Sequence, residues 1–357
     1  MSTLKQSLKR IVGHDRIALL RSIVADVDLW LARACVATRK TSALYYLLFN
    51  ARLHREMQAV MRGRLEFARR RREPGASSAL LRRNIHRIEK GLIMKQRRSV
   101  FGLDYLASTV EAYEQLTLAG NENAAELCWA HDVLTKYFEV AGENSLITAA
   151  RTRFESLPKR LDSGAVPHPR RNAPPLPFSY EDFYVLCRRR RSVRWFAPQP
   201  VDPAVVDKAI LAAAQSPSAC NRQPFRFHVF TEKLLVSKIS SIPMGTKGFA
   251  AGFPAVAVVT GDLACFYHER DRHVVYIDGA LAAMSFMFAL ETLGLASCSI
   301  NWPDIESFER EMEKTLPLEP FERPIMLIAF GYPDPDGDVP FSAKKELAFL
   351  RTYNRAI

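Results

Sequence analysis

The sequence predicts an α+β fold for the C-terminal half of the chain, preceded by a separate all-helical domain. Through most of residues 1–160, apolar residues recur every three or four positions, which is the period of an amphipathic helix. From residue 178 on, short runs rich in β-branched and aromatic residues alternate with helical stretches. Residues 161–177 lie between these halves, contain five prolines and show no periodicity, so we expect a linker there.

Individual elements follow from local patterns. We expect two or three helices within residues 1–72 and further helices through residues 78–155. In the second half, Asp202 and Pro203 match the N-cap and first position of a helix. The stretch 278–293 is apolar on every side, which predicts a helix buried all round, with Gly294 as its C-cap. Strands are predicted at Phe225–Phe230, Pro254–Asp262 and Arg323–Pro333.

The helical half carries the positive charge of the chain. Residues 1–175 contain 30 Lys and Arg against 17 Asp and Glu, whereas residues 176–357 contain 20 against 21. Within the first half, residues 51–100 contain 15 basic and 4 acidic residues. One interpretation is that Arg52–Arg72 forms a basic amphipathic helix on an anionic membrane or an acidic partner. The other is a solvated helix face whose apolar side packs on the domain.

Several classes of protein are disfavoured. The basic stretch lacks a zinc-finger, RNA-recognition or helix-turn-helix pattern, so nucleic acid is not expected as a partner. The six cysteines include no C-x-x-C pair, and His86 with Glu89 would supply only two ligands, so we expect neither disulfides nor a metal site. No signal-peptide pattern is visible, and the apolar run Ala43–Phe49 is too short to span a bilayer. We therefore expect a cytoplasmic protein, peripheral to the inner membrane surface if the basic helix binds lipid.

An arginine-rich segment follows the linker. Arg190, Ser192 and Arg194 occupy alternate positions, and in an extended backbone alternate side chains point to the same side. Two guanidinium groups flanking a hydroxyl suit a phosphate monoester, because their forked donors match its oxygens. Short arginine runs are also common on solvated surfaces, so this segment alone leaves both interpretations open.

A polar turn follows the helix that begins at Pro203. Ser216, Pro217 and Ser218 end that helix, and Asn221 and Gln223 precede the first strand. The two amide side chains offer donors and acceptors that suit the hydrogen-bonding edge of a flat heterocycle.

Together, the R-x-S-x-R segment and the S-P-S-x-x-N-x-Q-P turn resemble the signature of the FMN-dependent nitroreductase family, and the resemblance covers about residues 178–357. It implies a mixed or antiparallel sheet flanked by helices, and a homodimer with FMN at its interface. It further implies an NAD(P)H oxidoreductase, with NADH or NADPH as reductant, acting on a small-molecule substrate by ping-pong hydride transfer through flavin N5. The flavin carries this chemistry, so no catalytic acid or base is expected from the protein.

The resemblance also implies roles for individual residues. Arg190, Ser192 and a lysine of the tail would hold the FMN phosphate, and Arg194 would lie near the N1–C2=O edge of the ring. Asn301 and Trp302 match a strand-loop whose backbone N–H faces N5; Trp302 would either narrow the substrate pocket or pack in the core. The ring and ribityl contacts would come from Pro217, Ser218, Cys220, Asn221 and Gln223 across the dimer interface. The tail candidates are Lys344 and Lys345, where the family usually has an arginine.

A second hypothesis does not require an enzyme. The C-terminal half would be a flavin-binding or degenerate scaffold, and the N-terminal helical domain would bind a membrane surface or an acidic partner.

Overall fold

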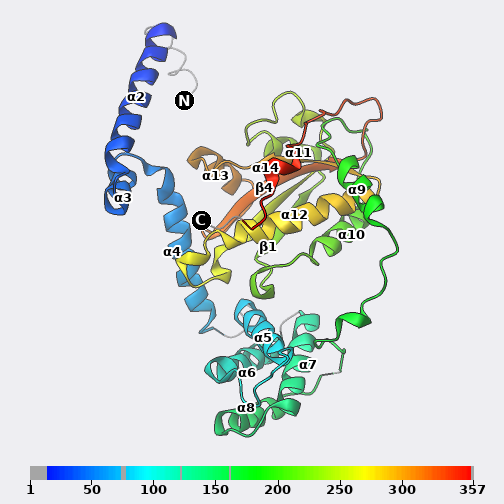
Figure 1. Cartoon of the computed structure of the whole chain (residues 1–357). Helices are drawn as coiled ribbons and strands as arrows, with labels where there is room; N and C mark the ends of the chain where they lie inside the picture. The colour runs from blue at the N-terminus through cyan, green and yellow to red at the C-terminus, as the bar shows by residue number, and fades with distance from the viewer. Residues whose placement is uncertain (1–13, 74–77, 121–122, 161, 355–357) are drawn as a thin grey trace. The chain divides into compact units, whose positions relative to one another are not determined.

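The computed structural model describes residues 14–73, 78–120, 123–160 and 162–354. The chain divides into two compact units. The first contains the chain up to Ala59 together with residues 304–307, and the second contains residues 60–303 and 308–357. The N-terminal helical region therefore contributes to both units, and helices make up all its described secondary structure (Figure 1).

The first unit is built from short-range helical contacts. Thr38 and Thr41 form a reciprocal capping box that starts the second of its helices. The hydroxyl of buried Tyr45 donates a hydrogen bond to Asp28 at 2.5 Å and joins the first two helices. Its elements are α2 (His14–Cys35), α3 (Arg39–Leu48), η1 (Ala51–Leu53) and the first turns of α4 (His54–Arg70).

Four helices of the second unit form a bundle with its own core. Ile85, Tyr113 and Tyr137 are fully buried there. Gly91 permits a close approach, because a Cβ atom at this position would lie 2.3 Å from the ring of Phe101. The four helices are α5 (Ala79–Leu92), α6 (Leu103–Leu118), α7 (Ala124–Val140) and α8 (Ser145–Glu155).

The C-terminal half contains a four-stranded antiparallel sheet in the order β1-β2-β4-β3. The central pair β2 and β4 is almost wholly buried, which explains its continuous apolar sequence. The predicted α+β class is thereby confirmed, with all the strand pairs antiparallel. The strands are β1 (Phe225–Phe230), β2 (Ala255–Asp262), β3 (Ala296–Asn301) and β4 (Glu322–Gly331).

Helices cover both faces of this sheet (Figure 1). Alternate residues of β2 point to opposite faces: Val259 packs with α10 and α12, and Val258 packs with α11 and α13. The C-terminal helices are α9 (Tyr180–Arg189), α10 (Pro203–Ala213), α11 (Lys233–Ser240), α12 (Val274–Thr292), α13 (Glu306–Glu313) and α14 (Leu347–Leu350).

α12 begins four residues before the predicted start and is buried on the side of the sheet, but Ile277 and Leu281 are exposed, so the prediction of a helix buried all round is wrong for the single chain. His273 precedes it without a side-chain cap, so no capping signal marked that end. Gly294 has a φ of +81° and, as predicted, ends the helix in the left-handed conformation. Residues 269–292 are long and apolar enough to cross a membrane, but Phe286 and Leu290 are fully buried against the sheet, as in a core helix.

The second half of the basic helix α4 packs on the C-terminal half of the chain. Arg70 forms a salt bridge with Asp262 at 2.8 Å, and Arg64 pairs with Glu269. Gly63 lets the backbones approach, since a Cβ atom there would lie 2.8 Å from Leu263 Cβ. With Arg55 and Arg69, which also form salt bridges, four of the basic side chains of α4 are used within the protein. The proposed contact with a membrane or acidic partner remains a prediction for the others.

We expect the α12–sheet contact to be sensitive to one added methyl group. A Cβ atom at Gly279 would lie 2.3 Å from Ile325 Cδ1. Gly279→Ala should lower the free energy of unfolding by about 1 kcal/mol, because overpacking of roughly 1–3 kcal/mol exceeds the gain of about 1 kcal/mol in helix propensity. In an Ile325→Val background, which removes Cδ1, the same change should be stabilising. Urea titration of the wild type, the two single variants and the double variant measures the coupling between positions 279 and 325. Additive changes in the free energy of unfolding would contradict it.

A second expectation concerns pH. Hydrogen bonds from Arg69, with Arg70 beside it, hold the pKa of the Glu66 carboxyl at about 2, below its usual 4.5. Because the folded pKa is depressed, this stabilisation is complete above pH 4.5 and is lost as the pH falls towards 2. The urea midpoint of the wild type should therefore approach that of Glu66→Gln as the pH is lowered across this range. A constant difference between the two proteins would contradict the interaction.

Candidate cofactor-binding site

The predicted phosphate-binding residues lie beside the edge strand β3. α9 ends at Arg189, whose guanidinium donates to Glu291 of α12 at 2.7 Å. The chain then runs alongside β3: Ser192 pairs in parallel with Ser297, and the N–H of Val193 donates to the Ser297 carbonyl at 3.0 Å. The N–H of Val193 also lies 3.1 Å from the Arg191 carbonyl, so the backbone turns at Ser192 instead of being extended throughout the R-x-S-x-R segment.

The two arginines of this segment both act on β3. Burial raises the pKa of the Cys298 thiol, and the charges of Arg194 and Arg190 act in the opposite direction, so both guanidinium groups lie within electrostatic range of this thiol. Arg194 donates to the carbonyl of Ser192 at 3.1 Å and lies 5.5 Å from the centre of the Phe249 ring. Both predicted cations therefore lie in the neighbourhood of β3, and their joint role in binding a phosphate stays a prediction.

One buried polar atom of this segment, Arg190 Nε, has no hydrogen-bond partner among the described residues, and on β3 the same holds for Ser297 Oγ. A buried donor left without an acceptor costs about 1–3 kcal/mol, and more when it is charged. An anionic group with several oxygens would satisfy Arg190 Nε. Two guanidinium groups together with the hydroxyl of Ser192 fit a phosphate monoester such as that of FMN.

Arg191 performs a different task from its neighbours. Its guanidinium donates to the carbonyls of Pro340 and Phe341 and so ties the C-terminal tail to the arginine segment. Lys344 and Lys345 follow this contact by three and four residues and are exposed. The sequence did not predict this role of Arg191, although the residue lies between Arg190 and Ser192 in the predicted phosphate segment.

The second predicted element, the turn 218–223, has an unusual backbone. Cys220, Asn221 and Gln223 all have φ near +50°, in the left-handed region that non-glycine residues rarely adopt. The N–H of Ala219 donates to the buried Asp278 carboxylate at 3.0 Å. The Gln223 side chain donates to the carbonyl of Ala214 at 3.1 Å. Burial raises the pKa of Asp278, and the Ala219 N–H opposes that rise.

An arginine of the helical bundle also holds this turn. Arg82 of α5 donates through Nε to the carbonyl of Asn221 at 2.7 Å and through Nη2 to Gln223 Oε1 at 3.1 Å. Its third nitrogen, Nη1, pairs with the buried Glu126 at 3.4 Å. The amide of Gln223 is therefore engaged on both sides by protein groups. No sequence signal pointed to Arg82, since its partners lie about 140 residues away.

The arginine segment and the turn lie at opposite ends of α12. Arg189, next to the segment, contacts Glu291 near the end of the helix, whereas the turn contacts Asp278 near its start. Thirteen residues of helix separate these anchors, which corresponds to about 20 Å at 1.5 Å per residue. Within one chain, the two halves of the predicted site are therefore not adjacent.

Trp302 belongs to the core. The side chain is buried, and its Nε1 donates to Glu309 Oε1 at 2.7 Å. Glu309 in turn lies 3.6 Å from a guanidinium nitrogen of Arg323. Of the two interpretations of the Trp302 ring, the structure supports packing in the core and not a position in a substrate pocket. Asn301 is exposed at the end of β3, and the predicted role of the backbone there stays a prediction.

The C-terminal half of the chain is similar to proteins of a known family. Residues 187–246 and 238–332 match the model of the nitroreductase family. An iodotyrosine deiodinase of Hydra vulgaris is 25% identical over 194 residues, covering 46% of this chain and 70% of that protein. Another, of Haliscomenobacter hydrossis, is 24% identical over 195 residues, covering 47% of this chain and 86% of that protein.

Two solved structures have a similar fold. An FMN-dependent nitroreductase from Clostridium difficile has a TM-score of 0.41 and 20% identity, covering 48% of this chain and 98% of that one. A nitroreductase family protein from Streptococcus pneumoniae has a TM-score of 0.42 and 22% identity, covering 48% and 99%. On the family match over residues 187–332, the C-terminal half of this chain is a nitroreductase-family oxidoreductase domain.

Proposed function

We propose that the chain is an FMN-dependent oxidoreductase that uses NADH or NADPH to convert a small organic substrate. The observation that carries this proposal is the buried, unpartnered Nε of Arg190, whose charge acts on the Cys298 thiol together with that of Arg194. Both arginines lie within the stretch that matches the nitroreductase family. When bound, FMN supplies the redox chemistry by carrying a hydride at N5 between the reductant and the substrate in two half-reactions.

In this proposal the residues of the chain bind and orient the cofactor. Arg190 and Ser192 hold the phosphate, with Lys345 as a cation of the tail. Arg194 supplies positive charge that favours a negatively charged, reduced ring. The side chains of Pro217, Ser218, Cys220 and Asn221 line the ring, while Gln223 keeps the turn in shape through its contacts with Ala214 and Arg82.

The proposed site is completed by a second copy of the chain. A single chain separates the arginine segment from the turn by the length of α12, so both halves meet at one cofactor only if each comes from a different subunit. The exposed face of α12 supports this arrangement, because Ile277 and Leu281 present apolar surface between the two halves. We propose a homodimer with one FMN site at each end of the interface.

A second candidate for the substrate class comes from the relatives. The Hydra and Haliscomenobacter proteins are named iodotyrosine deiodinases, and a Methanothermobacter thermautotrophicus relative is named as an NADH dehydrogenase or NAD(P)H nitroreductase. Halogenated phenols should therefore be assayed as acceptors together with quinones and nitro compounds. NADPH and NADH consumption with each class of acceptor separates these activities.

We propose that the protein is cytoplasmic, with any membrane contact made by the exposed part of α4.

The scaffold hypothesis makes a different prediction from the enzyme. A scaffold would bind FMN yet show no acceptor-dependent oxidation of NADH or NADPH, or would not bind FMN at all. Purified full-length protein that is yellow and turns over a quinone, nitro compound or halophenol would exclude it.

We expect Arg190→Gln to weaken FMN binding by about 10- to 100-fold. The change removes charge-assisted hydrogen bonds worth about 1.5–3 kcal/mol, at about 1.4 kcal/mol per tenfold in affinity. Quenching of flavin fluorescence on titration with the protein measures the affinity. Arg188→Gln is the matched control, because Arg188 belongs to the same arginine run but is exposed on α9. Equal FMN affinity in both variants, or a wild-type protein that binds no FMN, would overturn the assignment.

We further expect Arg82→Lys to loosen the turn. A lysine keeps a positive charge beside Glu126 but cannot reproduce both hydrogen bonds to Asn221 and Gln223. Losing these bonds, each worth about 0.5–1.5 kcal/mol, should speed amide hydrogen exchange in residues 219–223 by roughly 5- to 100-fold and weaken FMN binding. Arg97→Lys, at an exposed position outside the helices, should leave both measurements unchanged. Unaltered exchange in Arg82→Lys would show that the turn does not depend on this contact.

A further inference from the structure

A cavity of about 390 Å³ lies between the helical bundle and the C-terminal half of the chain, away from the arginine segment at β3. Its walls come from α5, from the start of α6, from the end of α4 and from the loop around η6 (Glu269–Asp271), and the turn contributes Arg222. The volume falls in the range of about 300–1,000 Å³ that is typical of sites for small molecules. None of the residues assigned above to FMN binding lines it.

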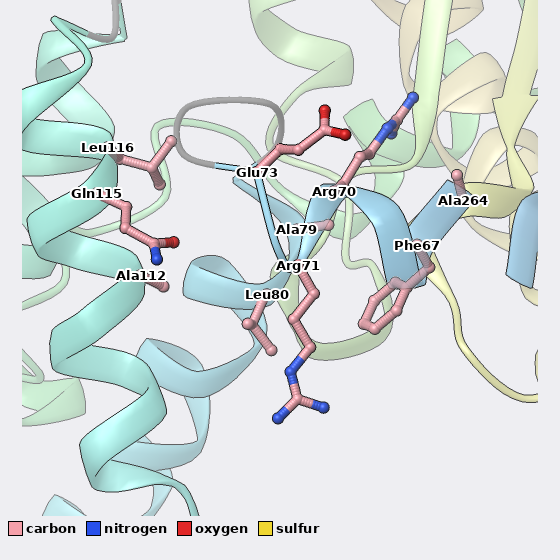
Figure 2. A pocket seen from close by; sticks show the side chains of 10 residues that line it. All are labelled: Phe67, Arg70, Arg71, Glu73, Ala79, Leu80, Ala112, Gln115, Leu116 and Ala264. Atoms are coloured by element: carbon pink, nitrogen blue, oxygen red, sulfur yellow. The ribbon is translucent and has the colours of Figure 1, made fainter. Parts of the chain in front are cut away.

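The neighbouring pocket drawn in Figure 2 shows how α4 reaches this region. Arg70 and Glu73 lie on one side, while the side chain of Arg71 extends past Leu80 and away from both. Arg71 and Leu80, together with Phe67, line the larger cavity as well. The cavity therefore has an apolar part, formed by Phe67, Leu80 and Tyr267, next to its charged part.

Positive charge dominates the lining. Five arginines face two aspartates, which leaves a formal excess of three positive charges. Arg71 at the end of α4 and Arg270 in the loop are exposed and therefore solvated. Arg83, Arg87 and Arg222 are only partly accessible, and they form the inner basic group.

The charges of this inner group are poorly compensated. Arg87 pairs with Asp104 at 3.0 Å, but the Asp104 side chain is 74% exposed, so the pair is screened by water. The guanidinium groups of Arg83 and Arg222 form no salt bridge or hydrogen bond with any residue that the structure describes, and Arg222 Nε is buried. The Arg222 guanidinium instead lies 4.6 Å from the centre of the Phe266 ring.

The three arginines also repel one another. Burial lowers the pKa of Arg83, and the charges of Arg222 and Arg87 lower it further, while Cys220 and Asp271 act in the opposite direction. Arg83 and Arg87 are four residues apart on α5, a spacing at which like charges destabilise a helix. Arg222 comes from a distant part of the chain. The fold thus places poorly compensated positive charges from α5 and from the turn 218–223 side by side in the wall of the cavity. An anion bound there would stabilise this arrangement.

We propose that this cavity binds a small phosphorylated molecule, whose phosphate is held by Arg83, Arg87 and Arg222 and whose remainder lies along Phe67, Leu80 and Tyr267. Guanidinium forks match the oxygens of a phosphate, and three of them suit a group that carries two negative charges. The site does not require FMN. Because Arg222 lies between Asn221 and Gln223, its occupant would contact the same turn that Arg82 holds.

The test measures the binding of diphosphate to the full-length protein by isothermal titration calorimetry. The protein is saturated with FMN, and the ionic strength is kept constant. We expect saturable binding that Arg83→Gln weakens at least about tenfold, the loss expected for one charge-assisted contact to phosphate. Lys90→Gln is the matched control, because it removes one exposed positive charge from the same helix, and it should bind as the wild type does. Arg222→Gln provides a second variant should Arg83→Gln fold poorly.

A further variant separates this site from the proposed FMN site. Arg190→Gln removes a cation at β3 and should keep the diphosphate affinity of the wild type, whether or not FMN binds. Hydrogen exchange should show protection by diphosphate in α5 around Arg83 and Arg87 and in residues 219–223. Three results would overturn the proposal: no saturable binding, binding lost in Arg190→Gln but kept in Arg83→Gln, or citrate binding as tightly as diphosphate.

Discussion

The burial of α12 against the sheet determines where both parts of the candidate site lie. Phe286 packs against Phe227 of β1 and Phe330 of β4, with ring centres 5.0 and 5.7 Å apart, and fixes the helix on the sheet. A buried helix of this length behaves as a rigid rod. Asp278 and Glu291 therefore hold the turn and the arginine segment at a constant separation, and neither part can move towards the other within one subunit.

The turn 218–223 shows why the helical bundle belongs to the site. Non-glycine residues in the left-handed region are strained by about 1–3 kcal/mol each and persist only where surrounding contacts hold them. Asp278 and Ser218 supply such contacts from the C-terminal half, and Arg82 supplies two from α5. The bundle is thus a support for a loop of the nitroreductase-family domain, whatever else its basic surface contacts.

Local patterns predicted much of the fold and of the arginine segment. Asp202 and Pro203 mark the start of α10, and the residue content of Phe225–Phe230 marks β1, because capping and strand formation depend on neighbouring residues. Contacts between segments that are distant in the sequence have no local sequence pattern by which they could be predicted. Arg82 looks like any surface arginine, and its role depends on a turn that only the folded chain brings beside it. Equally, nothing in the sequence distinguished a pocket-lining Trp302 from the core residue that it is.

The different surroundings of Arg190 and Arg191 also explain why the spacing of this segment is strict. The charge of Arg190 acts on the thiol of Cys298, whereas Arg191 donates to the carbonyls of the tail. Inserting a single amino acid between α9 and Ser192 would displace both arginines relative to β3 and the tail. Composition and charge would stay almost the same, yet the proposed phosphate site would lose one of its guanidinium groups and the tail would lose its anchor at the same moment.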